Sequence, residues 1–278
     1  MAFLCYDCCN MTWVIGMPSM FGYCVGLADV QATITYSDGT KKYFDSVQKI
    51  YPVGKFIVAG FSGTIKTGFR LIDDLKKWSH LPERGVAWIP DCLVIKWRRR
   101  ARRIFSLLPD KTRGTVSILL IGVYPQRDNG IPGEPQTYMC VMDSPDFEPR
   151  KYGSGKIASI GSGNNVAIYA DKIGKLNEGG YNPLMQMEVG NIGGYGQALM
   201  SYLSTVVNDT PVNGISNHMH YCIVRRGGIA IRKNDFSIYP AVGSKIDIRM
   251  PTVATNWDEF VELMNKENVD LSVAQAIA

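Results

Sequence analysis

Hydrophobic and polar positions in the first sixty residues follow the pattern of short β-strands separated by turns. The segment at 37–39, Ser-Asp-Gly, is a turn signal, and the residues that follow it read as the return strand of a hairpin. Strands are predicted at 12–16, 22–29, 41–44 and 56–59, the last ending at Gly60. This part of the chain is therefore expected to be β-rich.

After Gly63 the apolar period changes to that of a helix. Ile65, Phe69, Ile72 and Leu75 recur at helical spacing, which predicts a helix that runs to about Trp78. Further helices are predicted at 91–107, 165–176, 196–207 and 257–265, and further strands at 115–124, 137–142, 218–224 and 229–233. The last two strands flank an Arg-Arg-Gly-Gly turn and are expected to form a hairpin.

The order of these elements indicates the fold class. Strands and helices come in separate blocks, which argues against a doubly wound β-α-β sheet and favours an α+β fold. Two antiparallel sheets packed face to face, with helix pairs outside, would satisfy this order. We find no internal repeat and no long linker, so one main domain is the economical interpretation.

Composition places the chain among soluble globular proteins. Of 278 residues, 46% are hydrophobic and 20% are charged, and no apolar run is long enough to span a membrane. The N-terminal stretch lacks the basic and apolar regions of a secretory signal, so a cytoplasmic location is the expectation. Cys5, Cys8 and Cys9 form a CxxCC cluster without a second matching pair, so no metal site is expected there.

The net charge of +5 is concentrated in one segment. Residues 96–103 carry six positive charges in eight positions, and the apolar residues of the predicted helix fall on its opposite side: Leu93, Trp97, Ala101, Ile104 and Phe105. Such a helix could contact nucleic acid or an acidic partner subunit. No stacking aromatics or recognition motif accompany it, so a subunit contact is preferred and nucleic acid is not an expected partner.

Four residues near the predicted strand ends suggest nucleophilic catalysis. Thr12 begins a strand, Asp29 ends the next one, Lys49 lies before a third, and Gly60 closes that strand before a helix. A threonine hydroxyl needs a base to become a nucleophile, and an N-terminal α-amine with a pKa of about 7.7–8.0 can act as one. A lysine held charged by an aspartate would stabilise the alkoxide, and a glycine N–H could face the oxyanion.

The segments MTWVIG, ADVQAT, VQKIYPVGKFIVAGFSGT, IGSGNN and VRRGG resemble, in the same order, proteasome β subunits and the related bacterial HslV peptidase. These motifs extend from Thr12 to about Ala230. The resemblance implies a four-layer α-β-β-α sandwich, the fold of N-terminal-nucleophile hydrolases. It also implies a threonine-type endopeptidase that needs no cofactor, acts on polypeptides, assembles as a homo-oligomeric ring and works with an ATP-dependent unfoldase.

The same resemblance assigns the site residues. Thr12 would be the nucleophile and base, Asp29 the acidic partner, Lys49 the activating lysine and Gly60 the oxyanion donor. Two more residues are carried over by position: Ser162, in a Gly-Ser-Gly segment, lies near the threonine amine, and Asp209 would be a further supporting aspartate.

Three departures from the family pattern bear on these assignments. Residues 1–11 precede Thr12 and must be removed autocatalytically, or translation must start at Met11 with ordinary methionine removal. Propeptides of the family usually end in glycine, so the methionine before Thr12 favours a start at Met11. The interval from Thr12 to Lys49 is longer than usual, which implies an inserted loop around 37–39. The chain is also longer than a typical HslV subunit, and 130–149 and a C-terminal extension at 244–278 look like additions. The hydrolase domain is therefore expected at 12–243.

Other interpretations stay open. If Thr12 remains internal, the chain would be a non-catalytic structural subunit, and a small-amide amidase of the same superfamily is another alternative. His218, His220 and Cys222 alternate on one predicted strand and could form a metal trio, although ordinary packing is favoured. Cys24 lies in mid-strand without a nearby histidine and is expected to be a core residue.

Overall fold

The computed structural model describes residues 12–79, 90–124, 136–178, 183–188, 193–232, 251–271 and 274–277. Within these residues the chain forms helices and three sheets, and every paired strand within the sheets is antiparallel. The predicted α+β class is therefore confirmed. None of the described helices has the length and apolar character that crossing a bilayer requires.

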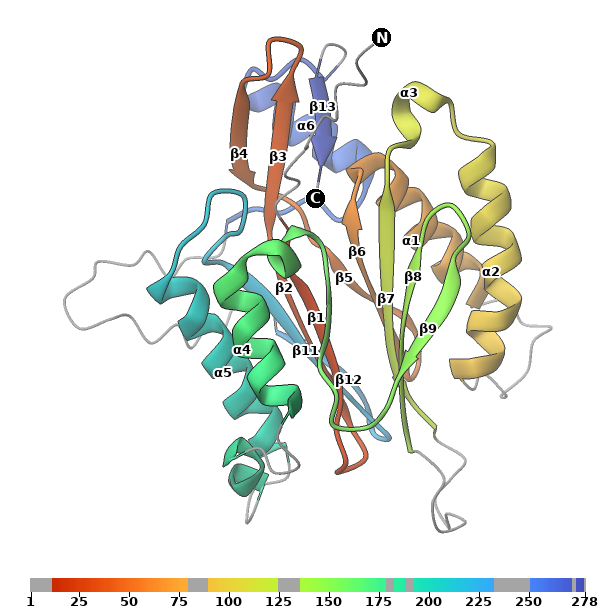
Figure 1. The fold of residues 1–278 in the computed structure, drawn as a ribbon. Helices are drawn as coiled ribbons and strands as arrows, with labels where there is room; N and C mark the ends of the chain where they lie inside the picture. The colour runs from red at the N-terminus through yellow and green to blue at the C-terminus, as the bar shows by residue number, and fades with distance from the viewer. Residues whose placement is uncertain are drawn as a thin grey trace, which may run out of the picture.

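Two five-stranded sheets make up most of the molecule. The first has the order β10-β1-β2-β11-β12, with β1 at Val14–Pro18, β2 at Cys24–Asp29, β10 at Ala158–Ile160, β11 at Met219–Arg225 and β12 at Gly228–Arg232. The second has the order β5-β6-β7-β8-β9, with β5 at Ile50–Gly54, β6 at Ile57–Gly63, β7 at Val116–Val123, β8 at Thr137–Asp143 and β9 at Glu148–Tyr152. Figure 1 shows the two sheets side by side between helices.

The two large sheets pack against each other through small and β-branched side chains. Val14 and Cys24 of the first sheet belong to one buried cluster with Val58, Leu119 and Ile121 of the second. Glycines allow the close approach, since a Cβ on Gly16 would lie 2.9 Å from side-chain atoms of both Leu119 and Ile121. The interior between the sheets is therefore closely packed.

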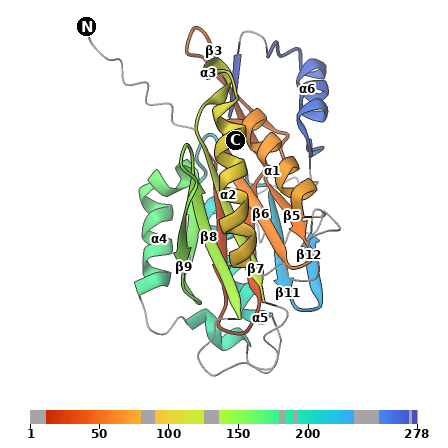
Figure 2. The same ribbon diagram turned by 90° about the vertical axis from the view of Figure 1, so that its right-hand side faces the viewer.

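Helices cover the outer faces of the two sheets. On the first sheet, α4 (Ala167–Glu178) and α5 (Gly194–Asp209) bury Tyr169, Tyr195 and Leu199 in a common cluster with Trp13 and Leu27. The second sheet is covered by α1 (Ile65–Ser79) and α2 (Pro90–Ser106), which lie in front of it in Figure 2. A short α3 follows at Asp110–Arg113.

A third, three-stranded sheet extends beyond the sandwich at one end. It has the order β13-β3-β4, with β3 at Gln31–Tyr36, β4 at Lys41–Asp45 and β13 at Ala274–Ile277. Helix α6 (Trp257–Lys266) lies beside it in Figure 1 and buries Phe260 and Met264 in the same core as α1. The described part of the predicted C-terminal extension thus packs onto the rest of the chain.

Most predicted elements are confirmed within two or three residues, including the hairpin formed by β11 and β12. β3 was implied only as the first strand of the hairpin that turns at 37–39, and the strands β5, β9, β10 and β13 were not predicted. β5 contains Pro52 and an irregular register beside it, β9 is largely exposed and charged, and β10 has three residues. None of these shows the apolar pattern by which strands are recognised. Residues 1–11 and 244–250, which fall in the two predicted extensions, lie outside the described residues.

Candidate active site

The register of β1 and β2 brings Thr12 and Asp29 together. Val14 pairs with Ala28 in this antiparallel ladder, so Thr12 and Asp29 lie at the same end of the two strands. The backbone N–H of Asp29 also donates a hydrogen bond to the carbonyl of Trp13 at 3.2 Å. Lys49 immediately precedes β5 in the opposite sheet, at the same end of the sandwich.

Lys49 connects the other two side chains. Its Nζ lies 2.8 Å from Asp29 Oδ1 and 3.3 Å from Thr12 Oγ1. Thr12 is 1% exposed, and Asp29 and Lys49 are fully buried. The arrangement predicted from sequence for these three residues is thus present, with the lysine ammonium between the carboxylate and the hydroxyl.

Asp29 is held by the backbone as well as by the lysine. Trp13 N donates to Asp29 Oδ2 at 2.7 Å, and Gln31 N donates to Asp29 Oδ1 at 2.9 Å. Burial raises the pKa of Asp29, while the charge and hydrogen bond of Lys49 oppose that shift. Burial likewise lowers the pKa of Lys49, with Asp29 opposing, so Lys49 gives up its proton more readily than an exposed lysine.

The Gly-Ser-Gly segment wraps around the backbone of Thr12. Thr12 N donates to Ser162 Oγ at 3.0 Å, and Gly163 N donates to the Thr12 carbonyl at 2.9 Å. Gly161 has a φ of 89°, and a Cβ there would lie 2.4 Å from Thr12 O. A larger residue at 161 would displace the threonine, so this turn fixes where Thr12 lies.

Gly60 is placed differently from the prediction. It lies inside β6, opposite Ile50 and Leu119, and does not close the strand. A Cβ at this position would come within 2.7 Å of Val14 Cγ1 and 3.4 Å of Lys49 O. Close packing therefore explains the glycine by itself, and its role as oxyanion donor stays a prediction.

Asp209 does not join the group. It is the last residue of α5 and is exposed. Within the described part of the chain, no hydrogen bond or ion pair connects it to Thr12, Asp29 or Lys49. The prediction of a supporting role rested on an approximate sequence position, and the end of α5 directs this residue to solvent.

A second carboxylate lies near Lys49, and no pattern in the sequence predicted it as part of the site. Asp45 ends β4 and accepts hydrogen bonds from His218 Nδ1 at 2.9 Å, Ser216 Oγ at 2.7 Å and Gln31 Nε2 at 3.1 Å. Burial alone would raise the pKa of Asp45, but these hydrogen bonds outweigh it and the pKa lies below its usual value. The charge of Asp45 also acts to raise the pKa of Lys49.

The residues of the alternative sites suggested by the sequence serve packing and hydrogen bonding. His218 contacts Asp45 as above, while His220 and Cys222 are buried in β11. No group of three or more metal-ligating side chains occurs in the described ranges. Cys24 donates its thiol to Gly122 O, and burial raises its pKa to about 12, so it stays protonated as a core residue.

Chemically, the group around Thr12 combines a hydroxyl, an ammonium and a carboxylate with a serine at the Thr12 nitrogen. Such a constellation can activate a nucleophile and stabilise the negative charge that develops when it attacks.

A search against protein-family models and a search of curated proteins both find no match for this sequence. Functional assignment therefore depends on the residues and their geometry.

Proposed function

We propose that this chain is a threonine-type endopeptidase of the N-terminal-nucleophile class, resembling proteasome β subunits and HslV, with Thr12 as the nucleophile. The observation that carries the proposal is the contact of Lys49 Nζ with both Thr12 Oγ1 and Asp29 Oδ1, at 3.3 and 2.8 Å. Two sheets packed face to face with helices outside support the corresponding four-layer fold.

The proposed reaction begins when the Thr12 α-amine, freed by loss of residues 1–11, takes the proton of Oγ1. The oxygen attacks a peptide carbonyl carbon, and the oxyanion of the tetrahedral intermediate is stabilised by a backbone N–H, for which Gly60 is the candidate. Collapse breaks the C–N bond, and the departing amine receives the proton held by the α-amine. Water then hydrolyses the ester on Thr12 by the same steps, with the α-amine again as base.

Each neighbour of Thr12 has a part in this scheme. The Lys49 ammonium lowers the energy of the alkoxide, and Asp29 orients that ammonium and balances its charge in a buried site. Ser162 Oγ lies 3.0 Å from the Thr12 nitrogen, where it can orient the amine. No cofactor takes part in the proposed steps.

One observation favours a second candidate function. With residue 11 attached, the Thr12 nitrogen is an amide and cannot act as a base, and the Thr12 side chain is almost completely covered. A chain that keeps residues 1–11 would therefore be a precursor or a non-catalytic structural subunit. The fold and the Lys49–Asp29 pair would then serve stability alone.

Assembly into a homo-oligomeric ring, with an ATP-dependent unfoldase as partner, belongs to the same proposal and rests on the resemblance. The basic helix α2 gives it little support. Three of its arginines form ion pairs within the chain, Arg98 with Glu148, Arg100 with Asp74 and Arg102 with Asp146. Exposed pairs of this kind contribute about 0–1 kcal/mol each, so they orient the helix more than they stabilise it.

A peptidase assay tests the proposed function. Fluorogenic peptides and a small-amide series are incubated with the wild-type chain, with Thr12→Ala and with Thr12→Ser. We expect hydrolysis of the peptides by the wild type, a loss of roughly 1000-fold or more in Thr12→Ala, and partial activity in Thr12→Ser, which keeps a hydroxyl. Equal rates for wild type and Thr12→Ala would refute the proposal, and hydrolysis of the small amides alone would indicate an amidase.

A further inference from the structure

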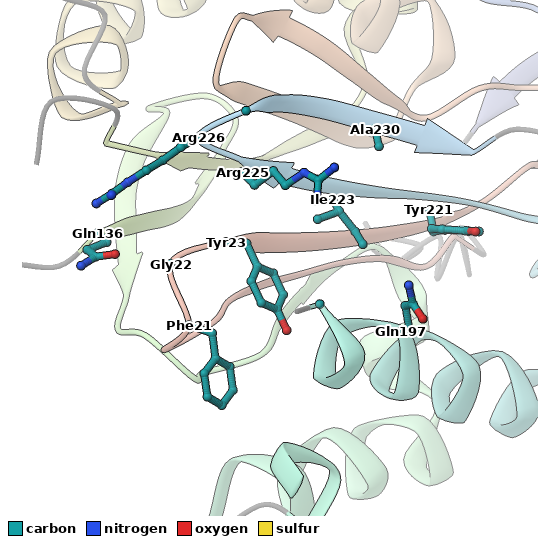
Figure 3. Close-up of a pocket in the computed structure, with 12 residues that line it drawn as sticks. Phe21, Gly22, Tyr23, Gln136, Gln197, Tyr221, Ile223, Arg225, Arg226 and Ala230 are labelled. Carbon is teal, nitrogen blue, oxygen red and sulfur yellow. The ribbon is translucent and has the colours of Figure 1, made fainter. Parts of the chain in front are cut away.

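A cavity of about 360 Å³ lies at the end of the sandwich away from Thr12. It is enclosed by the β1–β2 turn, the β11–β12 hairpin and the start of α5 (Figure 3). Thr12 precedes β1, whereas Phe21 and Tyr23 of this cavity follow it, so these residues lie about 20 Å from Thr12 along the strand. The cavity also extends along β11 to Tyr221, which pairs with Leu27. The cavity is thus distinct from the candidate active site.

The walls of the cavity are largely aromatic and apolar. Phe21 is 43% exposed, an unusual position for a large aromatic side chain that packs against Tyr23 and Tyr195. Tyr23, which is 3% exposed, is held in the wall by its hydroxyl, which donates to Glu188 Oε2 at 2.8 Å and accepts from Gly196 N at 3.0 Å. Ile223 of β11 continues this apolar surface. An apolar or aromatic group would find contacts on several sides.

The N-terminus of α5, beside the cavity, is already bound by a carboxylate, that of Glu188. Glu188 Oε1 accepts from Gly193 N at 2.9 Å, and Glu188 Oε2 accepts from Tyr195 N at 3.1 Å, in addition to the Tyr23 hydroxyl. The carboxylate therefore satisfies the first N–H groups of α5 and is itself well bonded. A ligand in the cavity does not need to serve this helix terminus.

The charged groups that line the cavity are both positive. Arg225 and Arg226 lie at the β11–β12 turn, and no aspartate or glutamate is among the described lining residues. Arg225 is exposed and forms no ion pair with a described residue, whereas the Arg226 side chain points toward Gln136, away from the side chain of Arg225 (Figure 3). Guanidinium groups beside an apolar surface are suited to a carboxylate, which they bind through paired N–H donors.

We propose that this cavity binds an organic carboxylate whose negative group meets Arg225 and whose aromatic or branched apolar body lies against Phe21, Tyr23 and Ile223. Gln136 and Gln197, also on the lining, supply amide groups for a polar atom such as a peptide oxygen. The ligand is a free small acid or the carboxyl end of a peptide, which share this chemistry. This inference does not rest on the proposed peptidase activity.

Calorimetric titration of the full chain tests the site. N-acetyl-L-phenylalanine is compared with N-acetyl-L-phenylalanine amide, which has the same shape without the charge. We expect the acid to bind roughly tenfold more tightly than the amide or better. A hexapeptide that ends in phenylalanine distinguishes the two sources: binding as tight as that of the small acid indicates a peptide terminus, and weaker binding indicates a free acid.

Variants locate the binding. Arg225→Gln should weaken binding of the acid by roughly tenfold or more and leave binding of the amide unchanged, and Phe21→Ala should weaken both. Arg99→Gln, an exposed arginine on α2, is the matched control and should bind like wild type. Thr12→Ala should also bind normally, which separates this test from that of the peptidase. Equal affinities for acid and amide, an Arg225→Gln variant that binds like wild type, or no binding up to about 10 mM would overturn the proposal.

Discussion

The buried pair of Lys49 and Asp29 makes a double-mutant cycle the most informative perturbation of this protein. Both side chains are fully buried and their charged atoms are 2.8 Å apart. Removing one partner of such a pair leaves an uncompensated charge and costs about 3–5 kcal/mol. Lys49→Met should lower the free energy of unfolding by about 3 kcal/mol, toward the low end of that range, because Asp29 keeps its hydrogen bonds from two backbone N–H groups. Asp29→Asn should cost about 4 kcal/mol, because the amide carries no negative charge to balance that of buried Lys49.

The double variant Asp29→Asn, Lys49→Met carries no buried charge at either position. Its main remaining cost is one lost backbone hydrogen bond to the side chain at position 29 and imperfect packing, about 3 kcal/mol in all. The expected sum of the single changes is about 7 kcal/mol, so the cycle predicts a coupling of about 4 kcal/mol.

Urea unfolding followed by the fluorescence of the buried Trp13 and Trp97 measures these free energies. Peptidase activity should be lost in all three variants, including the double variant whose stability partly returns. A double variant as unstable as the sum of the singles would show that the two charges do not interact, and would refute the reasoning. Activity retained in Lys49→Met would separate this lysine from catalysis.

Three further predictions concern the surroundings of the site. Gly60→Ala should destabilise the protein by about 1–3 kcal/mol in urea unfolding, because its Cβ would meet Val14, whereas Gly174→Ala, in open space on α4, should be neutral or slightly stabilising. Equal effects of the two changes would contradict the packing at Gly60. Ser162→Ala should lower kcat by about tenfold with little change in KM, through loss of the bond at the Thr12 nitrogen; an unchanged kcat would exclude this role. The pKa of Asp45 is lower in the folded state than in the unfolded state. The stability that its carboxylate contributes is therefore complete above the unfolded pKa, near 3.8, and is lost as the pH falls through the folded pKa. The difference in urea midpoint between wild type and Asp45→Asn should therefore shrink below about pH 4, and a constant difference from pH 6 to pH 3 would argue against this linkage.

Much of the architecture could be predicted because it follows from local periodicity. The helical spacing of Ile65, Phe69, Ile72 and Leu75 gives α1, and the turn residues before Gly228 give the β11–β12 hairpin. The strands that were missed lack such a pattern, since β9 is exposed on both faces and β13 is too short to show one. Their place depends on neighbouring strands and not on their own residues.

The candidate active site, like the fold, could be predicted from the sequence only in part. Thr12, Asp29, Lys49 and Ser162 could be placed because the segments around them resemble those of a known family, whereas each residue taken alone carries little signal. Their convergence depends on pairing across two sheets, which no short segment encodes. The partnership of Asp45 with Ser216 and His218 joins residues more than 170 positions apart, so a linear pattern gave no indication of it.

The N-terminus of the purified protein tests the central claim most directly. Catalysis by Thr12 requires a free α-amine, and intact-mass spectrometry together with N-terminal sequencing identifies the first residue of the active preparation. We predict a polypeptide that begins at Thr12, with its Oγ1 acylated when a slowly hydrolysed peptide ester is added. An active preparation in which every chain retains residues 1–11, or in which acylation falls on another residue, would contradict the account.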